Sequence, residues 1–310
     1  MNKIVKFELD DKKSIHDHFE KFGYVVIKDA INTNKIDAFI DSYESIRNQP
    51  LFVYYSQSIH VSTRPKLNAH GFIQESMQNA SRLTFFKKFS QSFQSCIYDK
   101  NVSAALTAIS GENQHVSWQN MFFDKSTGTI EHQDSWYLDT EPAGNLIGAW
   151  YALEDIHIDS GAFFVFPESH KIGLIDRDVY QKHDGYVTAV NEQIKNLKIN
   201  KKSMTLCKGD ILLWHPYLIH GADTCTDESL SRKSFTSHFY PIKYNVKNVE
   251  KNKILSIYDH KHPKVTKNPN IYSAFRYADS IYNILVYGLY FKNKLLSIRK
   301  NLSMRREDYK

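Results

Sequence analysis

The chain has 310 residues, of which 42% are hydrophobic and 14% aromatic, and its formal net charge is +6. This composition supports a large buried core and excludes a wholly disordered protein. The charge is modest for the length, and because Lys and Arg are spread along the chain rather than gathered in one stripe, we expect no nucleic-acid partner.

The first third of the chain predicts one strand followed by helices. The apolar run Phe22–Ile27 is typical of a buried strand. Behind it, apolar residues recur at spacings of three and four over residues 36–46, which predicts an amphipathic helix. Residues 76–110 are predicted to be helical as well.

From about residue 116 the pattern changes to short strands separated by turn residues. The predicted strands are Val116–Phe123, Leu146–Leu153, Phe163–Phe166, Met204–Cys207 and Ile211–Trp214. Residues 125–131 and 171–200 are predicted to be loops over a substrate. The series predicts a mostly β fold with flanking helices, in which the strands form a jelly roll.

The triplet His132-Gln133-Asp134 is the first chemical signal. In an extended segment, side chains two residues apart project to the same side, so His132 and Asp134 point together. With His220 they would complete a two-histidine, one-carboxylate facial triad. Such a site leaves positions open for a chelating 2-oxo acid and for dioxygen, whereas structural zinc usually takes four protein ligands.

Alone, this triplet is weak, because the chain has fourteen histidines and a solvated loop His beside a turn Asp is an equal alternative. The context strengthens the metal hypothesis. The turn Gly209-Asp210 leads into the apolar strand Ile211–Trp214, which delivers His220. Further on, alternation places Arg232 and Ser234 on one strand face, where a guanidinium and a hydroxyl can bind a carboxylate.

Several blocks in order resemble the phytanoyl-CoA dioxygenase family of Fe(II)/2-oxoglutarate oxygenases. They are the opening strand Phe22–Ile27, the H-Q-D signature at 132–134, the stretch Trp150–Asp155, and Ser160–His170. Arg232 follows His220 at a spacing similar to that of the family's arginine for the distal carboxylate of 2-oxoglutarate. The resemblance covers roughly residues 20–240. Ser160 and Glu168 depart from the family's Asn and Gly, which affects the loop shape and not the metal ligands.

The resemblance implies a cupin-like double-stranded β-helix that binds Fe(II) and the co-substrate 2-oxoglutarate and consumes dioxygen. The iron ligands carried over are His132, Asp134 and His220. The catalytic arginine is Arg232, and the 2-oxoglutarate-binding candidates are Arg232, Ser234, Gln133, Trp150 and Met121. For Trp150 and Met121 a place in the core is an equal alternative. The implied activity is a hydroxylase that releases succinate and CO2, and the alternative is a catalytically silent jelly roll that binds or senses a ligand.

The remaining histidines have plainer interpretations. His215 lies five residues before His220, an odd separation that points it away from the metal. His170 is predicted to brace a loop by hydrogen bonding. His157, His183 and His238 have no ligand-like neighbour in the sequence and are interpreted as surface or satisfied polar positions.

Residues 1–245 are predicted to form the dioxygenase domain and residues 246–310 a helical C-terminal extension. The extension holds the apolar run Ile281–Phe291, followed by six basic residues up to Arg306. Eleven apolar residues are too few to span a bilayer. Two interpretations stay open: a helix packed on the barrel or on a sister subunit in an oligomer, or a peripheral membrane contact through residues 281–306.

The substrate is expected to be a small molecule, with a preference for a lipid or a carbohydrate. The basic, aromatic C-terminus and three tyrosines, Tyr54, Tyr55 and Tyr137, suggest stacking on a sugar or an acyl chain. Three cysteines without a C-x-x-C pair and a start without a signal-peptide pattern predict a cytoplasmic protein. Membrane association through the C-terminus stays open as an alternative.

Overall fold

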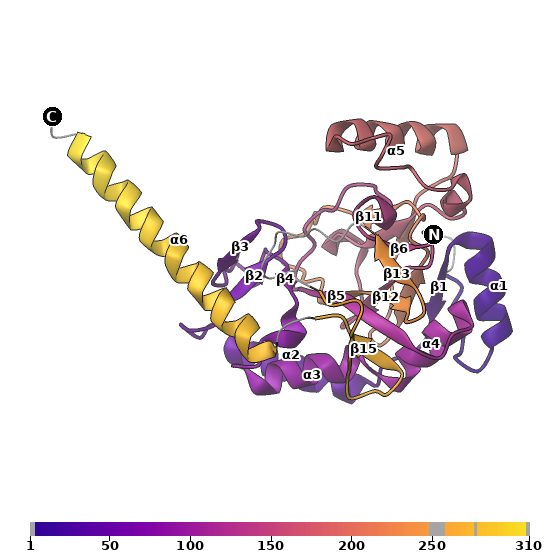
Figure 1. Cartoon of the computed structure of the whole chain (residues 1–310), viewed down its shortest axis with the longest axis horizontal. Helices are drawn as coiled ribbons and strands as arrows, with labels where there is room; N and C mark the ends of the chain where they lie inside the picture. The colour runs from indigo at the N-terminus through magenta and orange to yellow at the C-terminus, as the bar shows by residue number, and fades with distance from the viewer. Residues whose placement is uncertain (1–3, 248–257, 276–277, 308–310) are drawn as a thin grey trace.

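The computed structural model describes residues 4–247, 258–275 and 278–307, the stretch 299–307 by its backbone alone. A ten-stranded sheet forms the frame (Figure 1). Its main path runs in the order β1 (Tyr24–Ile27), β10 (Ile211–Trp214), β7 (Ile147–Ala152), β12 (Ser234–Pro241), β5 (His115–Phe123), β4 (Met77–Gln78), β2 (Tyr54–Ser56) and β3 (Val61–Thr63). These strands pair antiparallel.

Smaller sheets complete the β structure. One contains β11 (His220–Ala222), β8 (Phe163–Val165) and β9 (Lys202–Met204), and the other pairs β13 (Asn245–Lys247) with β6 (Asp139–Glu141). The helices are α1 (Lys12–Phe22), α2 (Thr33–Ile46), α3 (Lys87–Ile97), α4 (Lys100–Ser110), α5 (His183–Leu197) and α6 (Asp279–Glu307), with short 3-10 turns η1 (Ala80–Arg82), η2 (Asp134–Trp136), η3 (Ile158–Ser160) and η4 (Ser169–Ile172).

Alternation along the strands of the large sheet produces two different faces. One face packs on the N-terminal helices, where the Phe39 ring lies 4.6 Å from Phe235 and 5.1 Å from Phe122. The other face turns toward the small sheet, where Trp150 stacks on Phe163 at 5.4 Å. Because successive strand residues point to opposite faces, the strands that bury one set of side chains in the helical core present the other set to the space between the sheets.

The turn between α1 and β1 requires a glycine. Gly23 has φ +77° and ends α1, with its N–H donating to Phe19 O. A Cβ at this position would lie 2.5 Å from Nδ1 of His170. The close approach lets the turn after Pro167 pack against the start of β1.

Most predicted elements are present. The predicted jelly roll with flanking helices is the observed architecture, and β10 has the predicted bounds. The segment 76–110 is only partly helical, since it begins with β4 and η1, and the strand expected at Met204–Cys207 lies at Lys202–Met204. The prediction of a loop over 171–200 is wrong, because His183–Leu197 form α5, which buries Tyr186, Ala189 and Val190.

The segment after residue 257 joins the same frame. Strand β15 (Ile271–Ser273) runs parallel to the start of β5 and pairs with β14 (Lys264–Val265). Helix α6 then contacts β2 and β3 and runs away from the body (Figure 1). Among the described residues, no helix is long and apolar enough to cross a membrane.

Candidate metal centre

Two histidines from distant parts of the chain are joined by their backbones. His132 N donates to His220 O and His220 N donates to His132 O, both at 3.0 Å, in an isolated antiparallel bridge. The bridge sets the two imidazole rings side by side, with centroids 4.3 Å apart. The backbone therefore brings the predicted ligand His220 to the predicted pair.

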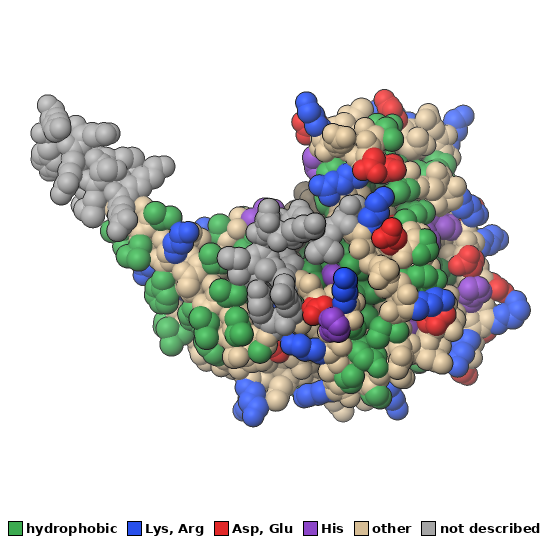
Figure 2. Space-filling model, in the orientation of Figure 1, with side chains coloured by type: hydrophobic (Ala, Val, Ile, Leu, Met, Phe, Trp, Pro, Cys, Tyr) green, Lys and Arg blue, Asp and Glu red, His purple; other side chains and the backbone are tan. Residues whose placement is uncertain are grey.

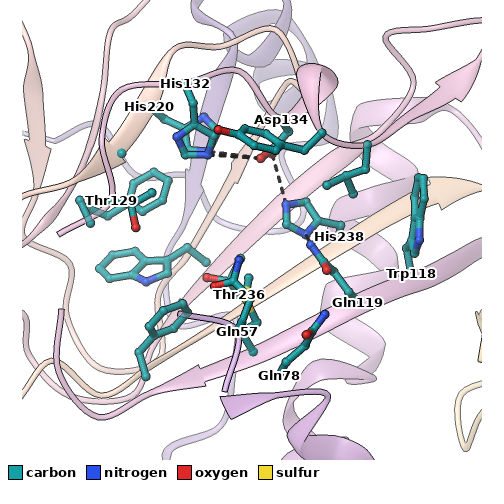
Figure 3. A pocket seen from close by; sticks show the side chains of 18 of the residues that line it. Gln57, Gln78, Trp118, Gln119, Thr129, His132, Asp134, His220, Thr236 and His238 are labelled. Carbon is teal, nitrogen blue, oxygen red and sulfur yellow. Dashed lines mark hydrogen bonds and ion pairs between the residues drawn. The ribbon is translucent and has the colours of Figure 1, made fainter. Parts of the chain in front are cut away.

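Asp134 completes the group without lying in a strand. It begins the 3-10 turn η2, so the strand geometry expected for the triplet is wrong in detail. Gln133 is nevertheless extended, with φ −104° and ψ 136°, which is sufficient to put His132 and Asp134 on the same side. Asp134 Oδ1 lies 3.6 Å from Nε2 of both His132 and His220 (Figure 3).

The donor set fits a divalent transition metal. One ligand atom from each of His132, Asp134 and His220 lies within 4.8 Å of the others. Nδ1 of His132 is 2.8 Å from Ile130 O, and Nδ1 of His220 is 2.8 Å from Leu218 O, so these nitrogens carry the ring protons. Both Nε2 atoms are thereby left as lone-pair donors, as a metal requires.

The second oxygen of Asp134 is held by two donors. Trp214 Nε1 donates to Oδ2 at 2.8 Å, and His238 Nε2 lies 3.2 Å from the same atom. Burial by itself raises the pKa of Asp134, but the neighbouring His238 and His220 outweigh it and keep the pKa well below its usual range. The carboxylate is therefore ionised and fixed, with Oδ1 turned toward the histidines.

The plain interpretation of His238 is wrong in one respect. The side chain is 3% exposed and contacts Asp134, so it has a ligand-like neighbour that the sequence does not place beside it. Gln119 Nε2 donates to His238 Nδ1 at 3.3 Å, which leaves the proton on Nε2 for Asp134. The alternating pattern of β12 could have predicted this position of His238, because Arg232 and His238 are an even number of residues apart and share a face.

Burial also sets the charge of His220. The residue is 2% exposed, and burial together with the neighbouring His132 lowers its pKa to about 3. The imidazole is therefore neutral near pH 7, which is the form that binds metals.

A cavity of about 590 Å³ opens beside these three side chains. Gln57, Gln78, Gln119 and Trp118 line it at one end, and Thr129 lines it at the other (Figure 3). The register between β5 and β12 shifts between His238 and Phe239, so that Gln119 pairs with His238 while Ser117 pairs with Phe239. This β-bulge lets the adjacent residues Trp118 and Gln119 both reach the cavity.

Arg232 is a buried cation on the cavity wall. It is 2% exposed, its guanidinium carbon lies 5.4 Å from the Phe123 ring and 5.7 Å from the Trp150 ring, and burial lowers its pKa to about 10. Within the described residues its Nε has no hydrogen-bond partner. A buried guanidinium with an unused donor fits an anionic ligand, because such a group otherwise pays the full cost of desolvation.

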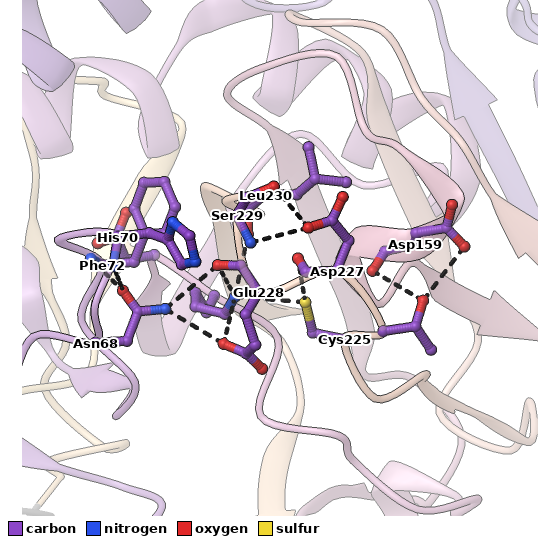
Figure 4. Close-up of polar contacts among 12 residues, drawn as sticks. Asn68, His70, Phe72, Asp159, Cys225, Asp227, Glu228, Ser229 and Leu230 are labelled. Carbon is purple, nitrogen blue, oxygen red and sulfur yellow. Dashed lines mark hydrogen bonds and ion pairs between the residues drawn. The ribbon is translucent and has the colours of Figure 1, made fainter.

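The loop that delivers Arg232 is held by polar contacts (Figure 4). Asn68 Nδ2 donates to Glu228 Oε2 at 3.2 Å, and Ser229 N donates to Asp227 Oδ1 at 3.0 Å. The buried Lys125 also donates to Glu228 O at 3.1 Å and to Leu230 O at 3.2 Å. The chain between His220 and Arg232 is thus held by contacts with residues distant in the sequence, which the local sequence pattern does not predict.

The other predicted site residues fall into two groups. Trp150 and Met121 line the cavity. Gln133 does not, because its amide donates to Gly173 O and Tyr217 O and accepts from Ile175 N. Ser234 is fully buried, and its hydroxyl donates to Arg232 O at 3.3 Å rather than into the cavity.

The other histidines considered in the sequence contact other residues. His215 packs against His170 at 5.4 Å, and His170 Nε2 bonds to Glu20 O at 3.0 Å, bracing a loop as expected. His183 Nε2 bonds to Tyr137 OH at 2.9 Å, and His157 lies 3.5 Å from Asp159.

The three tyrosines considered for substrate stacking are divided as well. Tyr55 and Tyr137 line the cavity, whereas Tyr54 is fully buried in the helical core. Of these three tyrosines, only Tyr55 and Tyr137 are therefore placed to stack on a substrate.

Comparison with known proteins shows which family this chain resembles. The phytanoyl-CoA dioxygenase family model matches residues 19–234. The human peroxisomal phytanoyl-CoA dioxygenase is 26% identical over 232 residues, covering 71% of this chain and 66% of that protein. The chain thus spans about two thirds of the length of that relative. A phytanoyl-CoA dioxygenase domain-containing protein 1 homolog of Caenorhabditis elegans is 22% identical, covering 82% of this chain and 99% of that protein.

Solved structures share the fold at low sequence identity. The epimerase SnoN, solved in complex with Fe3+, alpha ketoglutarate and nogalamycin RO, aligns with a TM-score of 0.60 at 12% identity, covering 86% of this chain and 99% of that one. EctD from S. alaskensis with bound Fe aligns with a TM-score of 0.54 at 14% identity, covering 78% and 79%. These likenesses support the jelly-roll assignment.

Proposed function

Because this chain belongs to the phytanoyl-CoA dioxygenase family, we propose that it is a non-haem Fe(II)- and 2-oxoglutarate-dependent dioxygenase. Its reaction hydroxylates a small molecule or a lipid or carbohydrate precursor and releases succinate and CO2. The observation that carries the proposal is the convergence of His132, Asp134 and His220 within 4.8 Å beside a cavity that also contains a buried arginine.

In this proposal His132 and His220 bind iron through Nε2 and Asp134 binds it through Oδ1. Their protein contacts already select these atoms, because each Nδ1 is used by a carbonyl and Oδ2 by Trp214 and His238. With 2-oxoglutarate and dioxygen, Fe(II) at such a site supplies oxidising power for an unactivated C–H bond. The chain's own part is to hold the metal on one face and to leave the cavity face open.

Arg232 is proposed to bind the distal carboxylate of 2-oxoglutarate. Its unused Nε and its buried charge favour a bidentate anionic partner, and the aromatic rings of Phe123 and Trp150 keep water from that charge. Trp150 and Met121 then line the co-substrate. Ser234 joins them only if its hydroxyl turns away from Arg232 O.

The substrate is proposed to occupy the end of the cavity lined by glutamines and aromatic rings. Gln57, Gln119 and Trp118 offer amide groups and a ring face, which suit a ligand with hydroxyl groups and an apolar side. Among the described residues that line the cavity, Asp134 is the one carboxylate side chain. This favours a neutral or anionic substrate over a cationic one.

The proposal is tested by loading the purified protein with Fe(II) without oxygen and then adding 2-oxoglutarate and air. We expect one iron per chain and succinate formation that requires both additions. His132→Ala should lose iron and turnover together. Arg232→Ala should keep iron and raise the Kd for 2-oxoglutarate by roughly 10- to 100-fold, as removal of a charge-assisted hydrogen bond does.

The matched control is His262→Ala, because the His262 side chain is 83% exposed and far from the ligands in the sequence. It should bind iron and form succinate as the wild type does. Iron binding without succinate formation would favour the silent ligand-binding alternative. A closed four-ligand zinc site would reject the oxygenase assignment altogether.

A further inference from the structure

Helix α6 begins as a tightly packed element. Tyr282 and Val286 are buried, and Tyr282 OH donates to Gln78 O at 2.9 Å. The fully buried Asn283 donates to Arg82 O at 2.8 Å, and Asp279 pairs with Arg82 at 2.9 Å. These contacts fix the direction in which the rest of the helix leaves the body.

The helix is uncovered from Phe291 to Ile298. All residues from 291 to 298 are exposed, and Figure 1 shows the helix running outward from the body. Four large apolar side chains follow at spacings of seven, four and three, which places them on one helix face. They are Ile284, Phe291, Leu295 and Ile298, exposed by 62%, 53%, 61% and 47%.

Two exposed apolar residues of the body lie beside this helix. Tyr287 lies one turn before Phe291. Its ring is 5.6 Å from the Phe85 ring, and its hydroxyl donates a hydrogen bond to Leu51 O. Leu51 and Phe85 are themselves exposed. Hydrophobic side chains also gather on the visible side of the proximal part of α6 in Figure 2. We call this set the apolar stripe: Leu51, Phe85, Ile284, Phe291, Leu295 and Ile298.

Positive charge borders the stripe. At about 100° per residue, Lys292 and Lys294 fall on opposite edges of the face that carries Phe291 and Leu295. Both are exposed, as are Lys87 and Lys88 at the start of α3, close to Phe85. In the sequence, residues 280–306 contain six Lys or Arg and no Asp or Glu.

Charge complementarity decides what covers this surface. Two copies of a helix that carries only basic residues beside its apolar face would repel one another. An apolar stripe flanked by lysines is the pattern of a helix that lies in the headgroup region of an anionic bilayer. We propose that residues 284–298 of α6, with Leu51 and Phe85, dock the protein onto an anionic membrane surface.

Docking would bring the cavity close to the lipid. The hairpin formed by β2 and β3 packs against α6, and its residues Tyr55, Gln57 and His60 line the cavity. A bilayer that holds α6 would therefore lie on the side of the molecule that carries this hairpin. The docking surface itself does not depend on the proposed oxygenase chemistry.

The test is sedimentation of the full chain with vesicles of phosphatidylcholine, alone or mixed in equal parts with phosphatidylglycerol. We expect binding to the mixed vesicles at low salt, little binding to phosphatidylcholine, and at least a ~10-fold weakening when salt shortens the screening length below about 5 Å. The double variant Phe291→Ser/Leu295→Ser should lose binding, and Lys292→Glu/Lys294→Glu should lose it too.

Controls keep the test specific. Val179→Ser changes an apolar residue elsewhere that is even more exposed, at 71%, and Lys12→Glu changes an exposed lysine on α1. Both should bind as the wild type does, and all variants should keep its melting temperature. The proposal is overturned by no binding at low salt, by equal binding to both vesicles, or by lysine variants that bind normally. A serine variant that converts a dimer to a monomer would instead assign the stripe to a second copy.

Discussion

At the scale of single residues, the sequence predicts which side chains form the centre, but not which side chains surround and hold them. The spacing of His132 and Asp134 is informative because one extended residue between them is enough to align their side chains. Trp214 and His238, which hold Asp134, come from strands far along the chain. Their contact depends on strand register, which local patterns do not contain.

Trp214→Phe should weaken iron binding while leaving the fold intact. The substitution keeps an aromatic ring in the core and removes the Nε1 donor from Asp134 Oδ2, so that among the described residues His238 is the remaining partner of this oxygen. Partners of metal ligands commonly contribute 10- to 100-fold to affinity, and we expect a loss of about that size. Competition with a chromophoric chelator measures it. Trp118→Phe, which changes a cavity tryptophan that packs on Tyr240 instead, should keep the affinity. Equal affinities in the two variants would contradict the orienting role of Trp214.

At the scale of elements, most strands with continuous apolar runs are predicted closely, whereas the predictions for 76–84, for Met204–Cys207 and for the mostly polar helix α5 are wrong in part or in whole. Helix α5 buries only Tyr186, Ala189 and Val190 within the described chain, so its polar surface resembles a loop. The spacing of Tyr186, Val190 and Ile194 was the available signal for a helix. The bulge at Trp118 has no comparable signal, because the shift appears only when β5 pairs with β12.

Gly148→Ala should disturb β7 and the metal centre together. Gly148 pairs with Trp214, and a Cβ at this position would lie 2.1 Å from the indole ring. Overpacking of this kind costs about 1–3 kcal/mol or more, and relief requires that Trp214 move away from Asp134. We expect a lower melting temperature and weaker iron binding. Gly185→Ala, in α5 with nothing within 4 Å of its added Cβ, should show neither effect. Normal iron binding in the Gly148 variant would mean that Trp214 has room to adjust.

At the scale of the whole molecule, the sequence predicts a barrel with an extension but not how the extension is attached. Strand β15 pairs with β5 across a long separation in sequence, and α6 is locked by Asn283 and Tyr282 to the segment around Arg82. These contacts are between distant polar groups and short strands, which periodicity does not reveal. The boundary near residue 245 stays a prediction.

The stability of the molecule should fall as the pH drops below about 6.5. Burial lowers the pKa of His115 to about 4 and that of His215 to about 3. Well above pH 6.5 both histidines are neutral in the folded and unfolded states. Between pH 6.5 and about 4 the unfolded chain binds protons that the folded chain does not, so each group lowers the free energy of unfolding by up to about 1.4 kcal/mol per pH unit.

Urea unfolding at a series of pH values measures this slope. His215→Asn should make the dependence shallower by the share of one group, whatever its effect on the stability at neutral pH. His262→Asn, at an exposed position, should leave the slope unchanged. Parallel curves for the wild type and the His215 variant would show that this histidine titrates alike in both states.

The backbone bridge between His132 and His220 has a consequence for the order of folding and metal uptake. Its two reciprocal hydrogen bonds join the two ends of the segment from residue 132 to residue 220 by main-chain atoms alone. Folding therefore brings these ends together, and the entropy lost in closing the segment is not compensated by binding of the ion. In contrast to small zinc domains, which gain their structure from the metal, this chain should retain its cooperative unfolding after chelation, and iron should enter and leave a site that is already assembled.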